Sequence, residues 1–183
     1  MRKIVLTFGF AAGAVLAATM LLTLPLMEKI SYEKAAVIGY TSMVLAFLMV
    51  FFGVRSYREN VGSGRISFGR ALSVGLLIAL LGSVCYVVAW EVISHQFMPD
   101  FADKYAERAI EKAKSSGASD AQVAEQVRQM AEFKEMYKNP LIKVALTLIE
   151  PLPVGIIFAL VAAGTLSRKR RQPDGSAPTM TGA

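Results

Sequence analysis

Four long apolar stretches constrain this chain more than any other feature. They cover about residues 4–27, 35–54, 71–93 and 141–166. The hydrocarbon core of a bilayer is about 30 Å thick, and a helix rises about 1.5 Å per residue, so a membrane span needs roughly 20 apolar residues. The first two stretches carry no charge, the third carries only Glu91, and the fourth carries only Lys143 and Glu150. They lack the amphipathic stripes of soluble helices. We therefore predict an all-α, four-helix transmembrane bundle.

The first stretch has one alternative interpretation, a cleaved secretory signal, because Arg2 and Lys3 precede it. Its apolar run continues to Met27, well beyond the roughly 7 to 15 residues of an ordinary signal core. We expect an uncleaved first span.

Positive charge sets the expected orientation. With four spans, both termini and the loop after the second span share one side, where basic residues are dense and weakly neutralised. They are Arg55, Arg58, Arg65, Arg70, Arg168, Lys169, Arg170 and Arg171. On the other side, basic and acidic residues balance. The positive-inside rule then puts both termini in the cytoplasm of a bacterial inner membrane. The basic side chains serve as topology anchors on anionic headgroups, or alternatively as a site for a cytoplasmic partner. Nucleic-acid binding is disfavoured, because no soluble basic domain is present.

The segment between the third and fourth spans predicts a periplasmic helical hairpin over residues 99–138. Apolar residues recur at helical spacing in both arms, Ser115 to Gly117 interrupt them, and Ser119 to Gln122 has the form of a capping box. The apolar stripes are expected to pack on each other or on the membrane surface; the alternative is a docking groove for a partner helix. Residues 172–183 are rich in Pro, Gly, Ser and Thr and predict a disordered tail after a membrane domain of residues 1–171.

Small residues predict where the spans touch. Gly9 and Gly13 form a GxxxG pair in the first span, and Gly75 and Ala79 lie four residues apart in the third. Small side chains let helix backbones approach closely in membranes. We expect these seams to pack within one chain in preference to forming a homo-oligomer.

Glu150 is the least expected residue of the fourth span. A carboxylate in the membrane interior costs at least about 2.5–3.5 kcal/mol, so it normally faces the bundle interior, water or a partner. Pro151 and Pro153 cannot donate to the carbonyls of Thr147 and Ile149, which leaves oxygen atoms beside the carboxylate.

Two interpretations of Glu150 stay open. In the first it is a structural anchor, hydrogen-bonded to another helix or, less favourably, paired with Lys143. In the second, Glu150, with Glu91 as a possible helper, holds a proton or a cation. Glu91 lies beside Trp90 at the outer end of its span, where a carboxylate is inexpensive.

Catalytic and metal-binding motifs are missing from the sequence. It has one histidine, His95, and one cysteine, Cys85, and it contains no Walker loop, Rossmann fingerprint or HExxH motif. We expect no catalytic, cofactor-binding or metal-binding residues.

Two sets of residues resemble a known family. The inner loop reads Tyr57-Arg58-Glu59 and then Gly64-x-Ile66-Ser67-Phe68-Gly69, and the last span reads Asn139-Pro140, Glu150, Pro153-Val154-Gly155 and then Arg168-Lys169. This pattern is similar to that of the domain-of-unknown-function 4199 family of bacterial membrane proteins. The resemblance implies four membrane helices with an inserted extracytoplasmic helical segment, and it supplies no activity.

Two functions follow from these features. The one favoured by the sequence is a non-enzymatic assembly, scaffold or envelope-associated protein that acts through helix contacts, with another membrane protein or a second copy as partner. The alternative is a small transporter or proton- or ion-coupled component that uses Glu150 and the proline-broken span. An intramembrane enzyme is the least favoured class.

Overall fold

The protein is all-helical over the part of the chain that the structure describes. A computed structural model describes residues 1–26 and 32–167. Its elements are α1 (Arg2–Thr23), the 3-10 turn η1 (Leu24–Leu26), α2 (Tyr32–Asn60), α3 (Phe68–Gln96), α4 (Phe101–Ser115), α5 (Asp120–Tyr137), α6 (Pro140–Ile149) and α7 (Pro151–Leu166). Met27, where we expected the first span to end, and the predicted tail lie outside the described residues.

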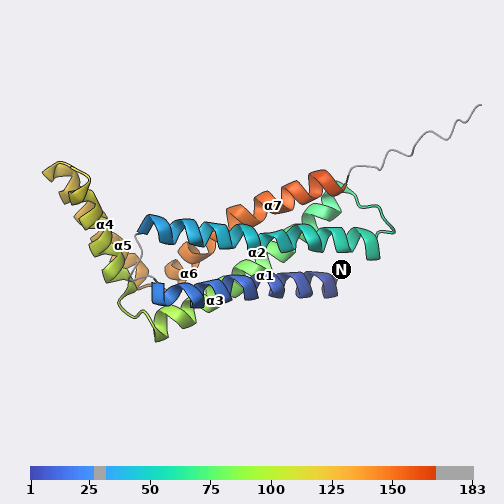
Figure 1. The fold of residues 1–183 in the computed structure, drawn as a ribbon, viewed down its shortest axis with the longest axis horizontal. Helices are drawn as coiled ribbons and strands as arrows, with labels where there is room; N and C mark the ends of the chain where they lie inside the picture. The colour runs from blue at the N-terminus through green and yellow to red at the C-terminus, as the bar shows by residue number, and fades with distance from the viewer. Residues whose placement is uncertain (27–31, 168–183) are drawn as a thin grey trace, which may run out of the picture.

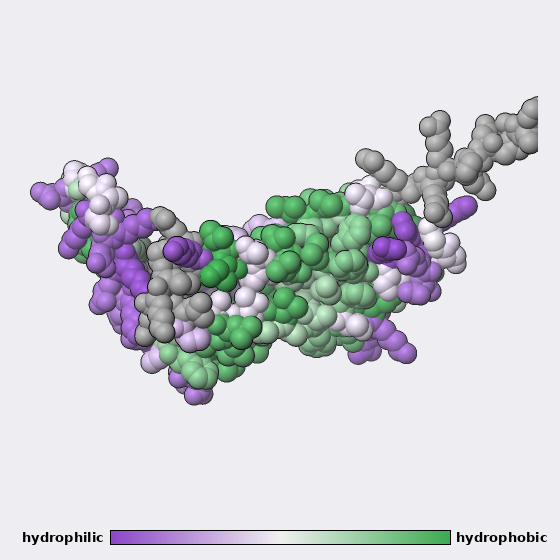
Figure 2. All heavy atoms as spheres, viewed as in Figure 1, coloured by the Kyte–Doolittle hydropathy of each residue, from purple (hydrophilic) through white to green (hydrophobic). Residues whose placement is uncertain are grey.

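Four apolar helices are long enough to cross a membrane: Arg2–Thr23, Ala36–Asn60, Phe68–Gln96, and α6 with α7 over Pro140–Leu166. Their apolar side chains form a band between two polar ends (Figure 2). The start of α1, the loop between α2 and α3 and the end of α7 lie together at one end, the loop end (Figure 1). The hairpin of α4 and α5 lies at the opposite end, the hairpin end. This is the architecture of a multi-pass membrane protein with an extramembrane helical hairpin.

The core lies among α1, α2, α3 and α7 and contains no residue of α6. Its largest fully buried apolar side chains include Leu16, Met43, Phe47, Val50, Val54, Val74 and Ile78. α7 packs on α2 and α3, whereas α6 packs chiefly on α3 and α5. The fourth span therefore changes neighbours at Glu150, and the helices pack less completely at the hairpin end.

Small residues lie at the closest helix contacts of this core. A Cβ atom at Gly13 would stand 2.3 Å from Cys85 Cβ, and one at Gly9 would stand 2.6 Å from Leu81 Cδ2, so both glycines seat α1 on α3. On the other side of α3, Gly75 faces Ala159, and Ala79 faces Gly155. All four residues predicted as packing seams thus make contacts within the chain, where a larger side chain would force the backbones apart.

The two arms of the hairpin pack on each other. Phe101 of α4 meets Tyr137 of α5 with ring centroids 5.8 Å apart, and Tyr105 of α4 meets Phe133 of α5 at 5.3 Å. An ion pair between Lys134 and Asp103 also joins the arms. The capping box is confirmed, because Ser119 Oγ accepts from the Gln122 amide while the Gln122 side chain accepts from the Ser119 amide. The aromatic part of each predicted stripe is therefore turned toward the other arm, whereas Val127 of the α5 stripe stays exposed.

Candidate functional site

A large cavity occupies the hairpin end of the bundle. Its volume is about 1080 Å³, and its walls come from the ends of α1, α2 and α3, from the hairpin and from α6. Glu150 lines it, as do Tyr86 and Trp90 of α3, Tyr40 of α2 and Tyr137 of α5. Pockets that hold drug-sized ligands range over about 300–1000 Å³. The space is therefore large enough for an organic molecule.

Glu150 meets a partner on another helix. The Tyr86 hydroxyl of α3 donates to Oε2 of Glu150 at 2.8 Å. The Glu150 side chain is nevertheless exposed, because it faces the cavity that it lines. A carboxylate in this position accepts one hydrogen bond and keeps access to whatever fills the cavity.

The two prolines place Glu150 at a break in the fourth span. α6 ends at Ile149, α7 begins at Pro151, and Glu150 between them keeps helical dihedral angles, φ −68° and ψ −55°. Pro151 is fully buried and occupies the first position of α7, where a missing N–H is tolerated. The carbonyls of Thr147 and Ile149 have no proline N–H to accept from, so polar atoms gather at this break.

Lys143 pairs with Glu91 and not with Glu150. Its Nζ lies 3.0 Å from Glu91 Oε2 and 2.8 Å from the Ser94 hydroxyl. The Lys143 side chain is only 16% exposed. Glu91 does not line the cavity. The two intramembrane carboxylates that the sequence grouped together are thus distinct: Glu91 ties α3 to α6, and Glu150 faces open space.

A second polar tie joins the hairpin to α3 at the edge of the cavity. The Trp90 indole N–H donates to the Tyr137 hydroxyl at 2.8 Å, and the Trp90 ring stacks edge-on against Phe101 with centroids 4.7 Å apart. Burial raises the pKa of the Tyr137 hydroxyl to about 12, and the carboxylates of Glu91 and Glu150 act in the same direction. Tyr137 is therefore a neutral wall of the cavity at physiological pH.

Comparison with known proteins places the chain in a family. The family described as "Protein of unknown function (DUF4199)" matches residues 7–168. The chain belongs to this family. No curated protein and no solved structure matches it.

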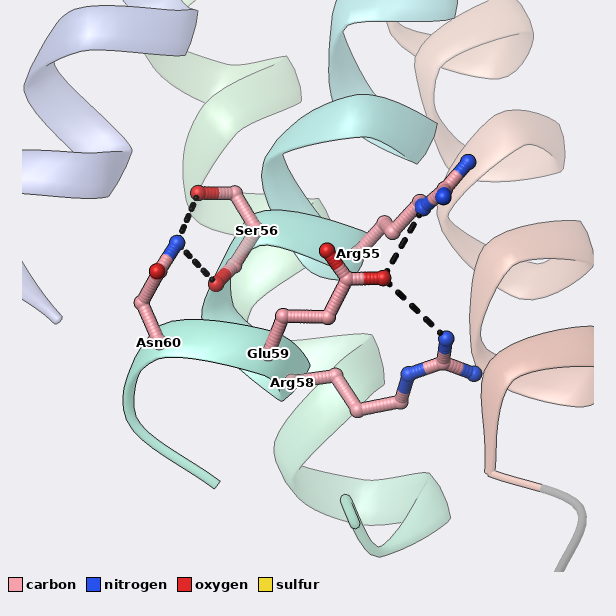
Figure 3. Close-up of polar contacts among 5 residues, drawn as sticks. All are labelled: Arg55, Ser56, Arg58, Glu59 and Asn60. Carbon is pink, nitrogen blue, oxygen red and sulfur yellow. Dashed lines mark hydrogen bonds and ion pairs between the residues drawn. The ribbon is translucent and has the colours of Figure 1, made fainter. Parts of the chain in front are cut away.

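In this DUF4199 member the basic residues at the end of α2 and in the loop between α2 and α3 lie at the loop end, away from the cavity. Arg55 Nε and Arg58 Nη2 lie 3.0 Å and 3.4 Å from the same Glu59 oxygen (Figure 3). Arg65 and Arg70 are exposed on either side of the start of α3. Arg168, Lys169, Arg170 and Arg171 lie outside the described residues.

Arg65 lies in a tight turn between α2 and α3. Gly64 has φ +82°, and a Cβ atom at Gly62 would lie 2.1 Å from the Arg65 carbonyl oxygen. Glycine adopts the positive φ of Gly64 without strain, and at position 62 it leaves room for the Arg65 carbonyl oxygen.

Sequence reasoning on this DUF4199 chain found Glu150 but missed the side chains around it. Tyr86 and Trp90 are four residues apart on one face of α3, a spacing that puts a tyrosine and a tryptophan on the same side of a membrane helix. The spacing of Tyr86 and Trp90 was the sequence feature that could have identified the side chains around Glu150. Across residues 1–26 and 32–167, no group of three or more His, Cys, Asp or Glu side chains is placed to hold a metal ion.

Proposed function

We propose that this DUF4199 protein is a small membrane transporter or proton- or cation-coupled membrane component in which Glu150 is the exchanging carboxylate. One observation carries the proposal: Glu150 is exposed to a large cavity within the apolar bundle. Lys143, the only basic residue of its span, is bonded to Glu91 instead. A carboxylate in the membrane interior is energetically costly, and one that faces a cavity is typical of a proton or ion pathway.

The break at Glu150 supports the same role. Transporters commonly bind solutes and ions where a membrane helix is interrupted, because the interruption frees carbonyl oxygens at mid-membrane. Here Pro151 and Pro153 free the carbonyls of Thr147 and Ile149 directly beside the carboxylate. We propose that the protein is not an enzyme.

We place the protein in the inner membrane of a bacterium, with both termini in the cytoplasm and the hairpin in the periplasm. The support is the dense basic charge of the loop end, where Arg65 and Arg70 are exposed. These side chains would contact anionic headgroups. The cavity, at the hairpin end, would then face the periplasmic half of the membrane.

Proton release from liposomes tests the role of Glu150. The protein is reconstituted with a pH-sensitive dye inside, and the small-molecule fraction of a cell lysate is added outside. We expect wild type to change internal pH faster than protein-free liposomes, Glu150→Gln to fall to the protein-free rate, and Glu59→Gln to match wild type. Glu59 is a suitable control because it is a carboxylate in the last turn of α2, at the loop end of the bundle, where it pairs with Arg55 (Figure 3). Equal rates for wild type and Glu150→Gln would contradict the proposal.

A second candidate function is the assembly or scaffold role. One observation favours it: Val127 and Met136 of α5 are each 46% exposed on the hairpin, outside the membrane. Affinity purification in mild detergent tests this role. A stoichiometric partner that is retained by Glu150→Gln and lost from Val127→Ser would support it, and recovery of the protein alone would count against it.

A further inference from the structure

Aromatic rings dominate the polar end of the cavity. They come from three helices, α2, α3 and α5, and Tyr137 is held in place by its hydrogen bond from Trp90. These aromatic lining residues are Tyr40, Tyr86, Trp90 and Tyr137, and the Tyr86 hydroxyl bonds to Glu150. The faces of such rings carry partial negative charge and attract cations within about 6 Å. A wall of this kind favours a ligand that is both apolar and positively charged.

The acidic and basic side chains that line the cavity belong to different parts of the protein. Among the described residues that line it, Glu150 is the one carboxylate, and it belongs to the membrane bundle. Lys104 and Arg108 also line the cavity, but both belong to α4 of the extramembrane hairpin. Lys104 is paired with Asp100 at 2.9 Å. Within residues 1–26 and 32–167, the membrane part of the cavity therefore carries the negative charge of Glu150, which forms no ion pair with a basic side chain there.

We infer that the cavity binds a lipophilic organic cation, with the positive charge on Glu150 and the apolar body along the aromatic wall. This inference rests on the proposed function, because it assigns a chemical class to the solute that Glu150 exchanges. An inorganic cation does not match the site as well, since hard cations such as Ca²⁺ take six to eight oxygen ligands, whereas these walls are mainly carbon. A cation with an apolar body uses both the charge and the rings.

Proton and organic cation compete for the same carboxylate. The Tyr86 hydroxyl donates to Glu150, and Tyr40 and Tyr137 line the same cavity. More distant charges are Lys143, which is neutralised by Glu91, and Lys104 and Arg108 on the hairpin. Of these, Glu150 is the carboxylate that loses its charge to a proton while facing the ligand. Cation binding should therefore weaken as the pH falls, and proton uptake should release the cation.

Equilibrium dialysis with two ions of the same shape tests the inference. Tetraphenylphosphonium and tetraphenylborate share size and apolarity and differ in the sign of their charge. We expect the purified full-length protein to bind the phosphonium, and to bind it at least about tenfold more weakly in Glu150→Gln, because a charged hydrogen-bonding partner is lost. Glu59→Gln should bind as wild type does.

A second variant tests the aromatic wall without touching Glu150. Tyr40 is 55% exposed, so Tyr40→Leu keeps apolar area and leaves the packed core intact. We expect affinity for the phosphonium to fall about two- to fivefold in Tyr40→Leu, as for the loss of one cation–π contact. Trp90 is the only tryptophan of the chain and lines the cavity, so quenching of its fluorescence locates the bound ion.

The outcomes separate this inference from the proposed function. Equal binding of both ions, or tetraphenylphosphonium binding that does not depend on Glu150, would overturn the organic-cation assignment and would point to an apolar cavity for lipid chains. If the phosphonium does not bind but Glu150→Gln still abolishes proton release in liposomes, the ligand class is wrong and the proposed function stands. If both experiments fail, both proposals fall.

Discussion

Glu91 and Glu150 have the same side chain and opposite environments. Glu91 Oε2 is bonded to a Lys143 that is mostly buried, and Glu91 Oε1 is buried with no hydrogen-bond partner among the described residues. Glu150 accepts from Tyr86 and faces open space. Glu91 is therefore a structural carboxylate, and Glu150 is an accessible one.

The structural role of Glu91 predicts a stability effect. Glu91→Gln leaves the Lys143 ammonium without its counter-ion, and we expect the free energy of unfolding to fall by about 1–3 kcal/mol. The double variant Glu91→Gln/Lys143→Met removes both charges and should recover part of this loss, because replacing a whole ion pair by apolar groups is often neutral. Thermal unfolding in detergent, followed by circular dichroism, compares the three proteins. A double variant less stable than Glu91→Gln would contradict the pairing.

The sequence identified Glu150 and its two prolines because a charge and two helix breakers stand out in an apolar run. It could not identify the partners. Lys143 and Glu91 are 52 positions apart, and Tyr86 and Glu150 are 64 apart, so their contacts depend on how α6 and α3 lie in space. Lys143 was considered as a partner of Glu150 because both belong to the same span, and the nearer carboxylate came from α3 instead.

The close packing of α1 on α3 leads to a prediction about how two helices fit together. Gly13→Ala puts a Cβ atom 2.3 Å from Cys85 Cβ, so the helices must separate, and we expect a loss of about 1–3 kcal/mol of stability. Gly164→Ala on α7 is the matched control, since nothing lies within 4 Å of its added Cβ atom. Its stability should be unchanged or raised by up to about 1 kcal/mol through helix propensity. Equal unfolding temperatures of the two variants would argue against this seam.

The burial of Tyr137, which raises its pKa more than the hydrogen bond from Trp90 lowers it, predicts an alkaline transition. The pKa of Tyr137 is about 12 in the folded protein, above the ordinary tyrosine value of about 10. A raised pKa means that the stability from neutral Tyr137 is complete below about pH 10 and is lost as the pH rises through about 12. Trp90 fluorescence should change near pH 12 in wild type and not in Tyr137→Phe. A transition that persists in Tyr137→Phe would show that another group is responsible.

The helices and the hairpin follow from local patterns, and the cavity does not. Apolar length predicted the four spans, and the Ser119–Gln122 box marked the start of α5. The cavity arises because α7 packs on α2 and α3, whereas α6 packs chiefly on α3 and α5. That change of neighbours depends on the direction of the chain after the break at Glu150, and a pattern of apolar residues carries no such information.

At the scale of the whole molecule, the position of the two ends makes the topology testable. In a Cys85→Ala background, a single cysteine at Ser116 reports on the hairpin and one at Ser63 reports on the loop between α2 and α3. These positions lie at opposite ends of the bundle (Figure 1). We expect a membrane-impermeant maleimide to label Ser116→Cys in intact cells and to label Ser63→Cys only after permeabilisation. Labelling of Ser63→Cys in intact cells would reverse the orientation.

The central claim is that Glu150 is an accessible carboxylate inside a membrane bundle, and chemical modification tests it most directly. A hydrophobic carbodiimide reacts with protonated carboxyl groups in the apolar phase, and peptide mass spectrometry locates the adduct. We expect an adduct on Glu150 that increases as the pH falls and decreases when tetraphenylphosphonium is present, with Glu91 left unmodified because it is paired with Lys143. An unmodified Glu150 at every pH, or equal modification of Glu91 and Glu150, would contradict the account.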